Sequence, residues 1–219
     1  MGKLQTAAKV LRREGVSSLL HRSLHAAFER PIGYQRFTVI VLERGALRPP
    51  TSPAGISLSS RLATREDLES MRKAEGWRIS DQKVEWHERG YRCFLSEVDG
   101  RMAGYTWAHD HPTALLIEGL SISIPSDLIY NFDAFTHPDY RGFGLQSFRH
   151  HAVLSHPEWN EKRGLLGYVA ATNHSSRRGQ RKSGYSALGT IRLIGKGGRP
   201  RALFSRSLRR AGIHPAGGS

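Results

Sequence analysis

The residues with the clearest chemical potential form one run between a predicted strand and a predicted helix, Thr136-His137-Pro138-Asp139-Tyr140-Arg141-Gly142-Phe143-Gly144-Leu145. Two glycines after an arginine let the backbone turn tightly and approach a ligand closely. A helix that begins there directs its unpaired N–H groups and the positive end of its dipole toward that ligand, which suits a pyrophosphate. The third glycine of a dinucleotide-binding motif would fall on Ser147 and no Walker lysine follows, so neither of those phosphate sites is predicted. Taken alone, the run also fits a plain glycine turn.

These residues resemble the GNAT superfamily of acetyl-CoA-dependent N-acyltransferases. That family carries Arg/Gln-x-x-Gly-x-Gly/Ala between its fourth strand and third helix. The residues here that match are Arg141, Gly142 and Gly144, with Gln146 in place of the last Gly or Ala. A second family motif opens the next helix as Asn-x-x-Ala and closes it with Lys-x-Gly-Phe. Its spacing is matched by Asn173, Ser176, Lys182, Gly184 and Tyr185.

The resemblance implies an α/β (α+β) GNAT fold, with a mixed central sheet of about six to seven strands flanked by helices. The order of predicted elements between 55 and 208 agrees with that fold, and an N-terminal helical extension precedes it. The implied activity is an N-acetyltransferase that moves an acetyl group from acetyl-CoA, its cosubstrate, to a primary amine. No metal is implied.

The resemblance also assigns a set of cofactor-binding residues. Phe135 and Thr136 would pair through their backbone with the pantetheine arm, and Asn173 would bond the pantetheine or order the strands around it. Backbone N–H groups would hold the pyrophosphate, and they belong to Gly142, Phe143, Gly144, Leu145 and Gln146. Arg141, which precedes them, is part of the same cofactor-binding set. Gln146 is longer than the family's Gly or Ala, so its side chain either crowds the phosphate or donates to it.

Acetyl transfer needs a neutral amine, a polarised thioester carbonyl and a proton for the leaving thiolate. Alternation along the strand predicts that Asn131, Asp133 and Phe135 share one face. Asp133 aligns with an acidic position that many relatives use as a base; the alternative is a carboxylate neutralised by a neighbouring arginine. Gln180 stands where many relatives have the tyrosine that protonates the thiolate. Ser176 or a water would then supply that proton, or the thiolate leaves without help.

The expected acceptor pocket is lined by Trp77, Trp107 and Asn131, although aromatic packing in the core is the alternative for at least half of the tryptophans and tyrosines nearby. An amino sugar of polysaccharide or cell-envelope synthesis is the leading acceptor, and protein or tRNA amines are the alternative. A catalytically degenerate module that binds nucleic acid or a membrane is the rival class. His109, His111, His150 and His151 are expected to be core or surface histidines rather than metal ligands.

Charge is distributed unevenly along the 219 residues, which carry a net charge of +14. Residues 1–48 have a net charge of +6, residues 49–161 of −5 and residues 162–219 of +13, the last with no acidic residue. Basic flanks predict an anionic partner: a phosphorylated ligand, nucleic acid or weak contact with an anionic membrane. The chain has a single cysteine, Cys93, which favours a location in the reducing cytoplasm. A finer prediction is that the protein lies at the inner face of the membrane. A homodimer is also compatible with the sequence.

Apolar and proline patterns predict the domain boundaries. Residues 1–48 are expected to form a basic amphipathic helix, with Leu4, Leu11 and Phe28 on its apolar face, followed by a strand over 34–43. Three prolines mark 49–54 as a linker. Residues 55–210 are then expected to form the acyltransferase domain, and residues 211–219 a flexible tail. Asp99-Gly100 predicts a hairpin turn, and late strands are expected over 185–194 and 202–208.

Overall fold

The computed structural model describes residues 33–117, 119–195 and 200–216. The amphipathic helix expected near the N-terminus therefore lies outside the described residues. Contacts divide the chain into two compact units. The first unit includes 33–41, 112–125 and 168–216, and the second consists of 42–111 and 126–167.

A five-strand arrangement forms the centre of the second unit. Its strands hydrogen-bond in the order β2 (Leu58–Leu62), β3 (Arg92–Val98), β4 (Arg101–His109), β7 (Leu128–Thr136) and β8 (Gly164–Ala170). The first three pairings are antiparallel, whereas β7 runs parallel to β8 over Leu128–Tyr130. Asp99 and Gly100 have φ of 47° and 74°, which is the backbone that a two-residue β3–β4 turn requires. This confirms the predicted hairpin.

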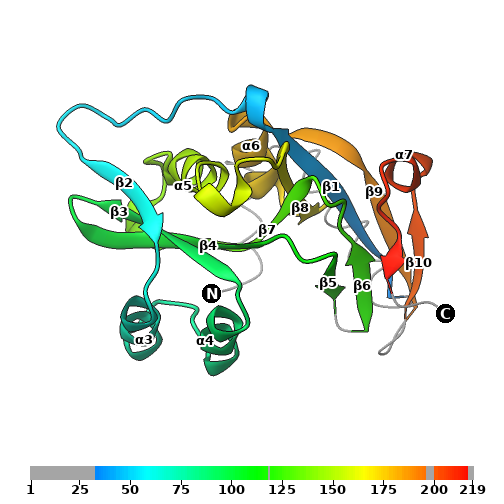
Figure 1. Ribbon diagram of the computed structural model, residues 1–219, viewed down its shortest axis with the longest axis horizontal. Helices are drawn as coiled ribbons and strands as arrows, with labels where there is room; N and C mark the ends of the chain where they lie inside the picture. Colours follow the sequence, from blue (N-terminus) through cyan, green and yellow to red (C-terminus); the bar gives the residue numbers. More distant parts are fainter. Residues whose placement is uncertain (1–32, 118, 196–199, 217–219) are drawn as a thin grey trace, which may run out of the picture. The chain divides into compact units, whose positions relative to one another are not determined.

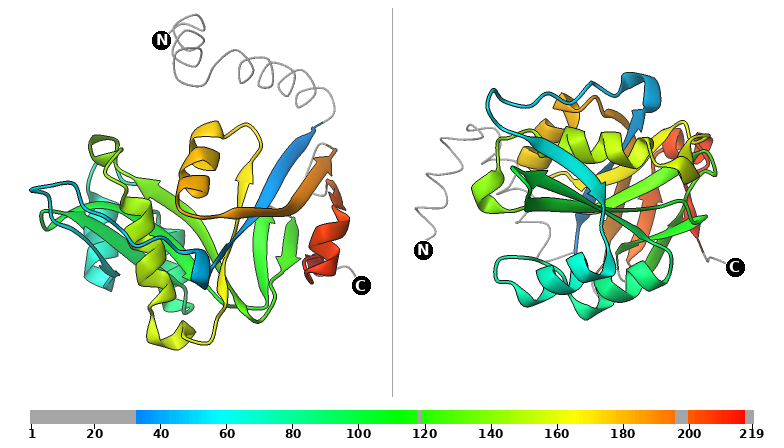
Figure 2. Two further views of the ribbon diagram at one scale, coloured as in Figure 1. Left: turned by 90° about the horizontal axis from the view of Figure 1, so that it is seen from above. Right: turned by 60° about the vertical axis from the view of Figure 1, so that its left-hand side comes forward.

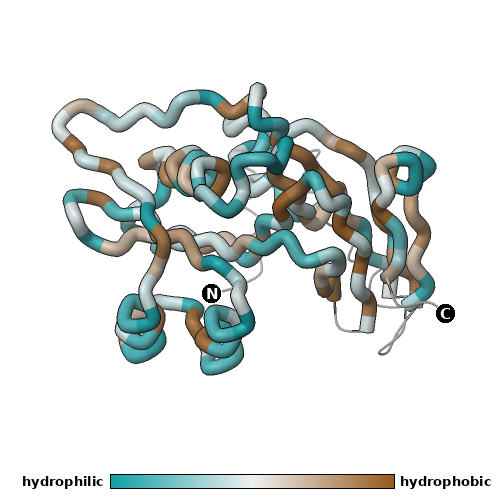
Figure 3. The backbone as a smooth tube through the Cα atoms, viewed as in Figure 1, coloured by the Kyte–Doolittle hydropathy of each residue, from teal (hydrophilic) through white to brown (hydrophobic). Residues whose placement is uncertain are grey.

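Helices cover both faces of that sheet (Figure 1). α3 (Arg65–Lys73) and α4 (Asp81–Glu88) lie on one face, where Leu68, Met71 and Val84 join an apolar cluster with Leu95 and Tyr105. α5 (Leu145–Leu154) lies on the other face and buries its first residue against Leu58, Val98 and Ala103. The capping box predicted for α3 forms between Thr64 and Asp67. Figure 3 shows teal, hydrophilic residues along the outer turns of α3 and α4.

In the first unit, β1 (Gln35–Glu43) pairs antiparallel with β9 (Ser186–Ile194), which pairs with β10 (Arg201–Phe204). A smaller antiparallel sheet is ordered β11 (Pro215–Ala216), β6 (Leu120–Ser123) and β5 (Thr113–Ile117). α6 (His174–Lys182) follows β8, and α7 (Arg206–Arg210), red in Figure 2, packs on β9. A Cβ added at Gly189 of β9 would lie 2.6 Å from Leu208 Cγ of α7. Short 3₁₀ turns occupy Arg44–Ala46, Pro138–Tyr140 and Pro157–Trp159.

The predicted fold class is confirmed, since the described chain is a mixed sheet with helices packed on it. The strands of the larger sheet number eight among the described residues, against the six to seven expected. The additional strand is β1, which pairs with β9 in this sheet. The sequence interpretation had placed β1 in an extension before the linker. The hairpin β5–β6 and the helix α7, which takes part of the strand expected over 202–208, were not predicted. Pro215–Ala216, expected in a flexible tail, pairs with β6.

Candidate active site

The glycine turn lies at the predicted place in the second unit, between β7 and α5. Gly142 has φ of 99° and Gly144, the N-cap of α5, has φ of 78°, a backbone region that favours glycine. A Cβ added at either glycine would meet no atom within 4 Å, so the outer side of the turn is open. Arg141 turns back toward the strand, where its Nε donates to the carbonyl of Thr136 at 3.4 Å.

The start of α5 presents backbone donors on this open side. The first N–H groups of a helix have no partner within it, and here they belong to Leu145 and Gln146. The Leu145 side chain is buried in the cluster beneath the helix, which fixes the position of those groups. A turn with open space, two left-handed glycines and a helix N-terminus is a suitable cradle for an anion such as a phosphate.

A β-bulge in β7 changes which side chains share a face. Tyr105 pairs with Phe135 and Trp107 pairs with Phe132, so two residues of β7 stand opposite Thr106. The bulge includes Asp133, whose φ is 45°. Alternation fails across it, and Phe135 therefore shares its face with Phe132.

The prediction that Asn131 shares the face of Asp133 and Phe135 is wrong for this reason. Asn131 lies on the opposite face, where its Oδ1 accepts from the Thr106 hydroxyl at 2.7 Å, and its side chain is buried. A buried amide that is bonded to a neighbouring strand packs within the sheet. The structure thus does not place Asn131 where an acceptor would contact it.

Asp133 lies in a network with a lysine and a tyrosine. Lys83 Nζ is 2.5 Å from Asp133 Oδ2 and donates to the Tyr105 hydroxyl at 3.0 Å. The tyrosine hydroxyl in turn donates to the carbonyl of Arg78 at 3.0 Å. The carboxylate is therefore paired with a lysine, not with the arginine that the alternative interpretation assumed.

Partial desolvation shifts the pKa values in this network, although the Asp133 side chain is still 33% exposed. Desolvation raises the pKa of Asp133 above its usual value, although the hydrogen bond and charge of Lys83 oppose the rise. Burial also raises the pKa of Tyr105, so that hydroxyl keeps its proton. A carboxylate whose pKa is raised toward neutrality is a better proton acceptor than an ordinary aspartate. Lys83 was not identified from the sequence, because only the packing of α4 on β7 brings it to Asp133.

Aromatic rings surround the network on the side of α3 and α4. Trp77 is half-buried, and its ring lies 6.4 Å from that of Tyr105 and 5.9 Å from that of Phe135. Trp107, by contrast, is fully buried and meets Trp86 edge to face at 5.4 Å. The expectation that Trp107 lines an acceptor pocket is thus corrected to a packing role, whereas Trp77 keeps an accessible part.

A buried arginine that the sequence did not single out connects α5 with the end of β7. Arg149 Nη1 donates to Ser96 Oγ at 2.8 Å and Nη2 donates to Thr136 Oγ1 at 3.0 Å. Burial lowers the pKa of Arg149 to about 10. Gly104 is the residue that leaves room for it, since a Cβ there would lie 2.6 Å from Nη1. The arginine therefore anchors Thr136 beside the glycine turn.

Three of the predicted positions lie in the first unit. Asn173 caps α6, where its Oδ1 accepts from the backbone N–H of Ser176 at 3.1 Å and from the Ser175 hydroxyl at 3.1 Å. Gln180 lies in the last turn of α6, two residues before Lys182. Cofactor binding by Asn173 and proton transfer by Ser176 remain predictions.

The four histidines considered above differ in burial, since His111 is half-buried and His151 is exposed. His109 and His150 are buried, and burial lowers their pKa values to about 4 and about 3. Cys93 is buried as well, and desolvation raises its pKa. In the described ranges no three His, Cys, Asp or Glu side chains gather as a metal site would require. No helix in those ranges is long and apolar enough to cross a membrane.

Comparisons with known proteins give structural neighbours only. No protein-family profile and no curated protein matches the chain. A protein described as an acetyltransferase of the GNAT family from Novosphingobium aromaticivorans aligns with a TM-score of 0.48 and 19% identity, over 75% of this chain and 66% of that one. A GCN5-related N-acetyltransferase from Kribbella flavida aligns with a TM-score of 0.48 and 17% identity, over 74% and 59%. The chain thus spans less than two thirds of the length of these two proteins.

A third neighbour is AAC(6')-Iy in complex with the bisubstrate analog CoA-S-monomethyl-acetylneamine. It aligns with a TM-score of 0.47 and 16% identity, over 68% of this chain and 97% of that one.

Proposed function

We propose that this protein is an N-acetyltransferase of the GNAT type, which transfers an acetyl group from acetyl-CoA to a primary amine. The observation that carries the proposal is the combination, within one compact unit, of an open glycine turn at the start of α5 and a bulged strand before it that carries Asp133. The first suits a pyrophosphate and the second suits a base for an amine.

The residues of the turn fit the phosphates of acetyl-CoA. Gly142 and Gly144 have no side chain to block an approach, and a Cβ at either position would point into open space. The N–H groups of Leu145 and Gln146 and the helix dipole provide the positive potential. Phe135 and Thr136, which precede the turn, are the residues we assign to the pantetheine arm, and Arg149 holds the Thr136 side chain.

The proposed chemistry gives Asp133 the role of base. Nitrogen attacks the thioester carbon, the C–N bond forms and the C–S bond breaks, while a proton passes from the amine to the Asp133 carboxylate. Lys83 orients that carboxylate through its 2.5 Å contact. Solvent supplies the proton that converts the leaving thiolate into a thiol, and proton transfer by Ser176 stays a prediction from the sequence. Tyr105 stays protonated, so it positions Lys83 and does not act as a second base.

We further propose an amino sugar as the acceptor. Trp77 keeps part of its ring exposed and stacks on Tyr105, whose hydroxyl contacts Lys83. An exposed aromatic face beside polar groups is suited to a ring that carries both apolar C–H and polar O–H groups. Protein and tRNA amines are the acceptors that the test must distinguish from amino sugars.

Thiol release from acetyl-CoA tests the proposal. The full chain is incubated with acetyl-CoA and, in separate reactions, with free and nucleotide-linked amino sugars, a lysine-containing peptide, or tRNA. Thiol release that depends on an amino sugar supports the proposal. Release that depends on the peptide or the tRNA keeps the acetyltransferase and overturns the acceptor. If no amine stimulates release, the enzyme class is wrong, and the degenerate binding module takes its place.

A further inference from the structure

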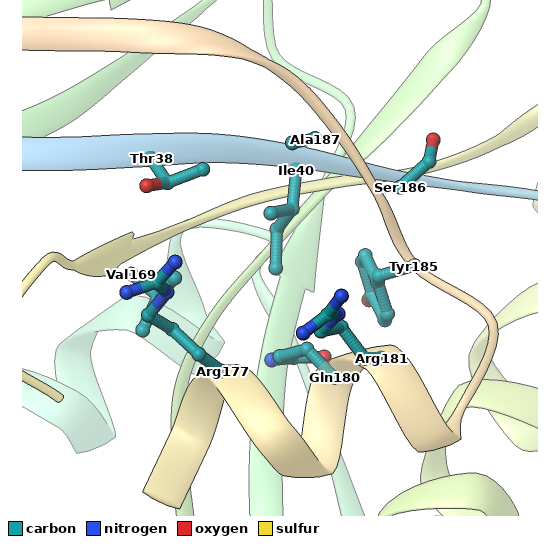
Figure 4. Close-up of a pocket in the computed structure, with 9 residues that line it drawn as sticks. All are labelled: Thr38, Ile40, Val169, Arg177, Gln180, Arg181, Tyr185, Ser186 and Ala187. Atoms are coloured by element: carbon teal, nitrogen blue, oxygen red, sulfur yellow. The ribbon is translucent and has the colours of Figure 1, made fainter. Parts of the chain in front are cut away.

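The first unit contains a pocket of about 340 Å³ beneath α6, and of its lining residues only Gln180 and Tyr185 were considered above. Its walls come from β1, β8, α6 and the start of β9. Figure 4 shows the side chains of Arg177, Gln180 and Arg181 directed from α6 toward the strand that carries Thr38 and Ile40. The volume is at the small end of the range for sites that hold small molecules.

Two guanidinium groups line this pocket without a neutralising acid. The described residues of the first unit include ten arginines and lysines and no aspartate or glutamate. Arg177 and Arg181 are four residues apart on α6, so their like charges repel on one exposed helix face. Arg177 Nη1 donates to the carbonyl of Ala171 at 3.5 Å, and an anion between the two guanidinium groups would reduce their repulsion. Arginine binds carboxylate and phosphate through two parallel hydrogen bonds. The pocket therefore has the electrostatics of an oxyanion site.

The remaining lining residues add an apolar surface and an unmet polar group. Ile40, Val169 and Ala187 supply aliphatic surface, and the ring of Tyr185 closes one side. Gln180 Oε1 is buried and, among the described residues, has no hydrogen-bond partner. A buried amide without a partner is costly, and a ligand inside the pocket would relieve that cost.

We propose that this pocket binds a small organic oxyanion, a carboxylate or phosphate monoester attached to an apolar body. The two arginines hold the charged group, the aliphatic residues and Tyr185 contact the apolar body, and Gln180 Oε1 accepts from an N–H or O–H group on that body. This binding goes beyond the acetyl transfer proposed above and does not depend on it.

Titration calorimetry with four probes, without acetyl-CoA or an amine, tests the proposal on the full chain. The probes are phenylacetate, phenyl phosphate, the neutral phenylacetamide, and inorganic phosphate, which has no apolar body. We expect phenylacetate or phenyl phosphate to bind at least about tenfold more tightly than both phenylacetamide and inorganic phosphate. The one that binds identifies the charged group. Equal affinity for phenylacetate and phenylacetamide, or no binding of any probe, would overturn the proposal.

A matched pair of variants locates the binding. Arg181→Gln removes a lining charge, and Lys182→Gln removes the same charge from the next residue, which does not line the pocket. Arg181→Gln should weaken binding of the preferred probe by about tenfold, whereas Lys182→Gln should leave it unchanged. Equal weakening by both variants would mean that the net charge of α6, and not this pocket, attracts the anion. Because the probe comparison uses the wild-type chain, it stands even if a variant does not fold.

Discussion

Lys83 on α4 and Asp133 in the bulge of β7 form an ion pair with 2.5 Å between Nζ and Oδ2. The pair connects a helix that covers the sheet with the strand residue whose backbone has a positive φ. Burial and Lys83 act on the carboxylate in opposite directions, since burial raises its pKa and the lysine lowers it. If Asp133 is the base that we propose, the balance between the two sets the pH at which it accepts a proton, and this gives two of the predictions below.

Asp133→Asn should lower kcat by roughly 10²-fold or more, because the amide keeps the shape of the carboxylate and cannot accept a proton. The measurement is steady-state acetyl transfer at saturating acetyl-CoA. Asp127→Asn is the control, since Asp127 precedes the same strand and is paired with Arg163. The control should retain wild-type kcat. A kcat in Asp133→Asn equal to that of the control would assign the carboxylate a structural role.

Lys83→Met should shift the acid limb of the pH–rate profile to higher pH. Lys83 lowers the pKa of Asp133, so its removal lets that pKa rise further, and the base then ionises only at higher pH. The profile of kcat/KM against pH reports this shift. Lys73→Met, at the exposed end of α3, removes the same charge elsewhere and should leave the profile in place. An acid limb that is identical in all three proteins would show that Asp133 does not control it.

Gly104→Ala should lower the free energy of unfolding by about 1–3 kcal/mol, because there is no empty space at this position for the added methyl group. A Cβ there would lie 2.5 Å from the carbonyl oxygen of Phe135 and 2.6 Å from Arg149 Nη1. Gly45→Ala is the control, since a Cβ at Gly45 meets nothing within 4 Å. Urea denaturation of both variants measures the difference. Equal stability would show that Arg149 and β7 can move apart without cost.

Local sequence patterns predicted much of the second unit. The hairpin at Asp99-Gly100, the capping box at Thr64 and the glycine turn before α5 each depend on residues a few positions apart, so the chain itself specifies them. The bulge at Asp133 was not predictable in this way. Period-two alternation contains no signal for an inserted residue, and the error over Asn131 followed from that.

Long-range contacts account for the other differences. The position of β1 beside β9 depends on a partner about 150 residues later in the chain. Lys83 and Arg149 reach the site only through the packing of α4 and α5, and neither stands in a recognisable motif. The sequence therefore predicted only those residues of the candidate site that lie on β7 and on the turn that follows it.

The most direct test of the proposed function is titration calorimetry of acetyl-CoA with the wild type, Gly144→Glu and Gly55→Glu. Gly144 and Gly55 have φ of 78° and 76°, and a Cβ at either meets no atom within 4 Å, so glutamate imposes the same backbone strain at both. At residue 144 the new carboxylate would occupy the anion cradle at the start of α5 and repel phosphate. We predict equal affinity for the wild type and Gly55→Glu, and at least about tenfold weaker binding by Gly144→Glu. Equal affinity in all three proteins, or no binding by the wild type, would contradict the account.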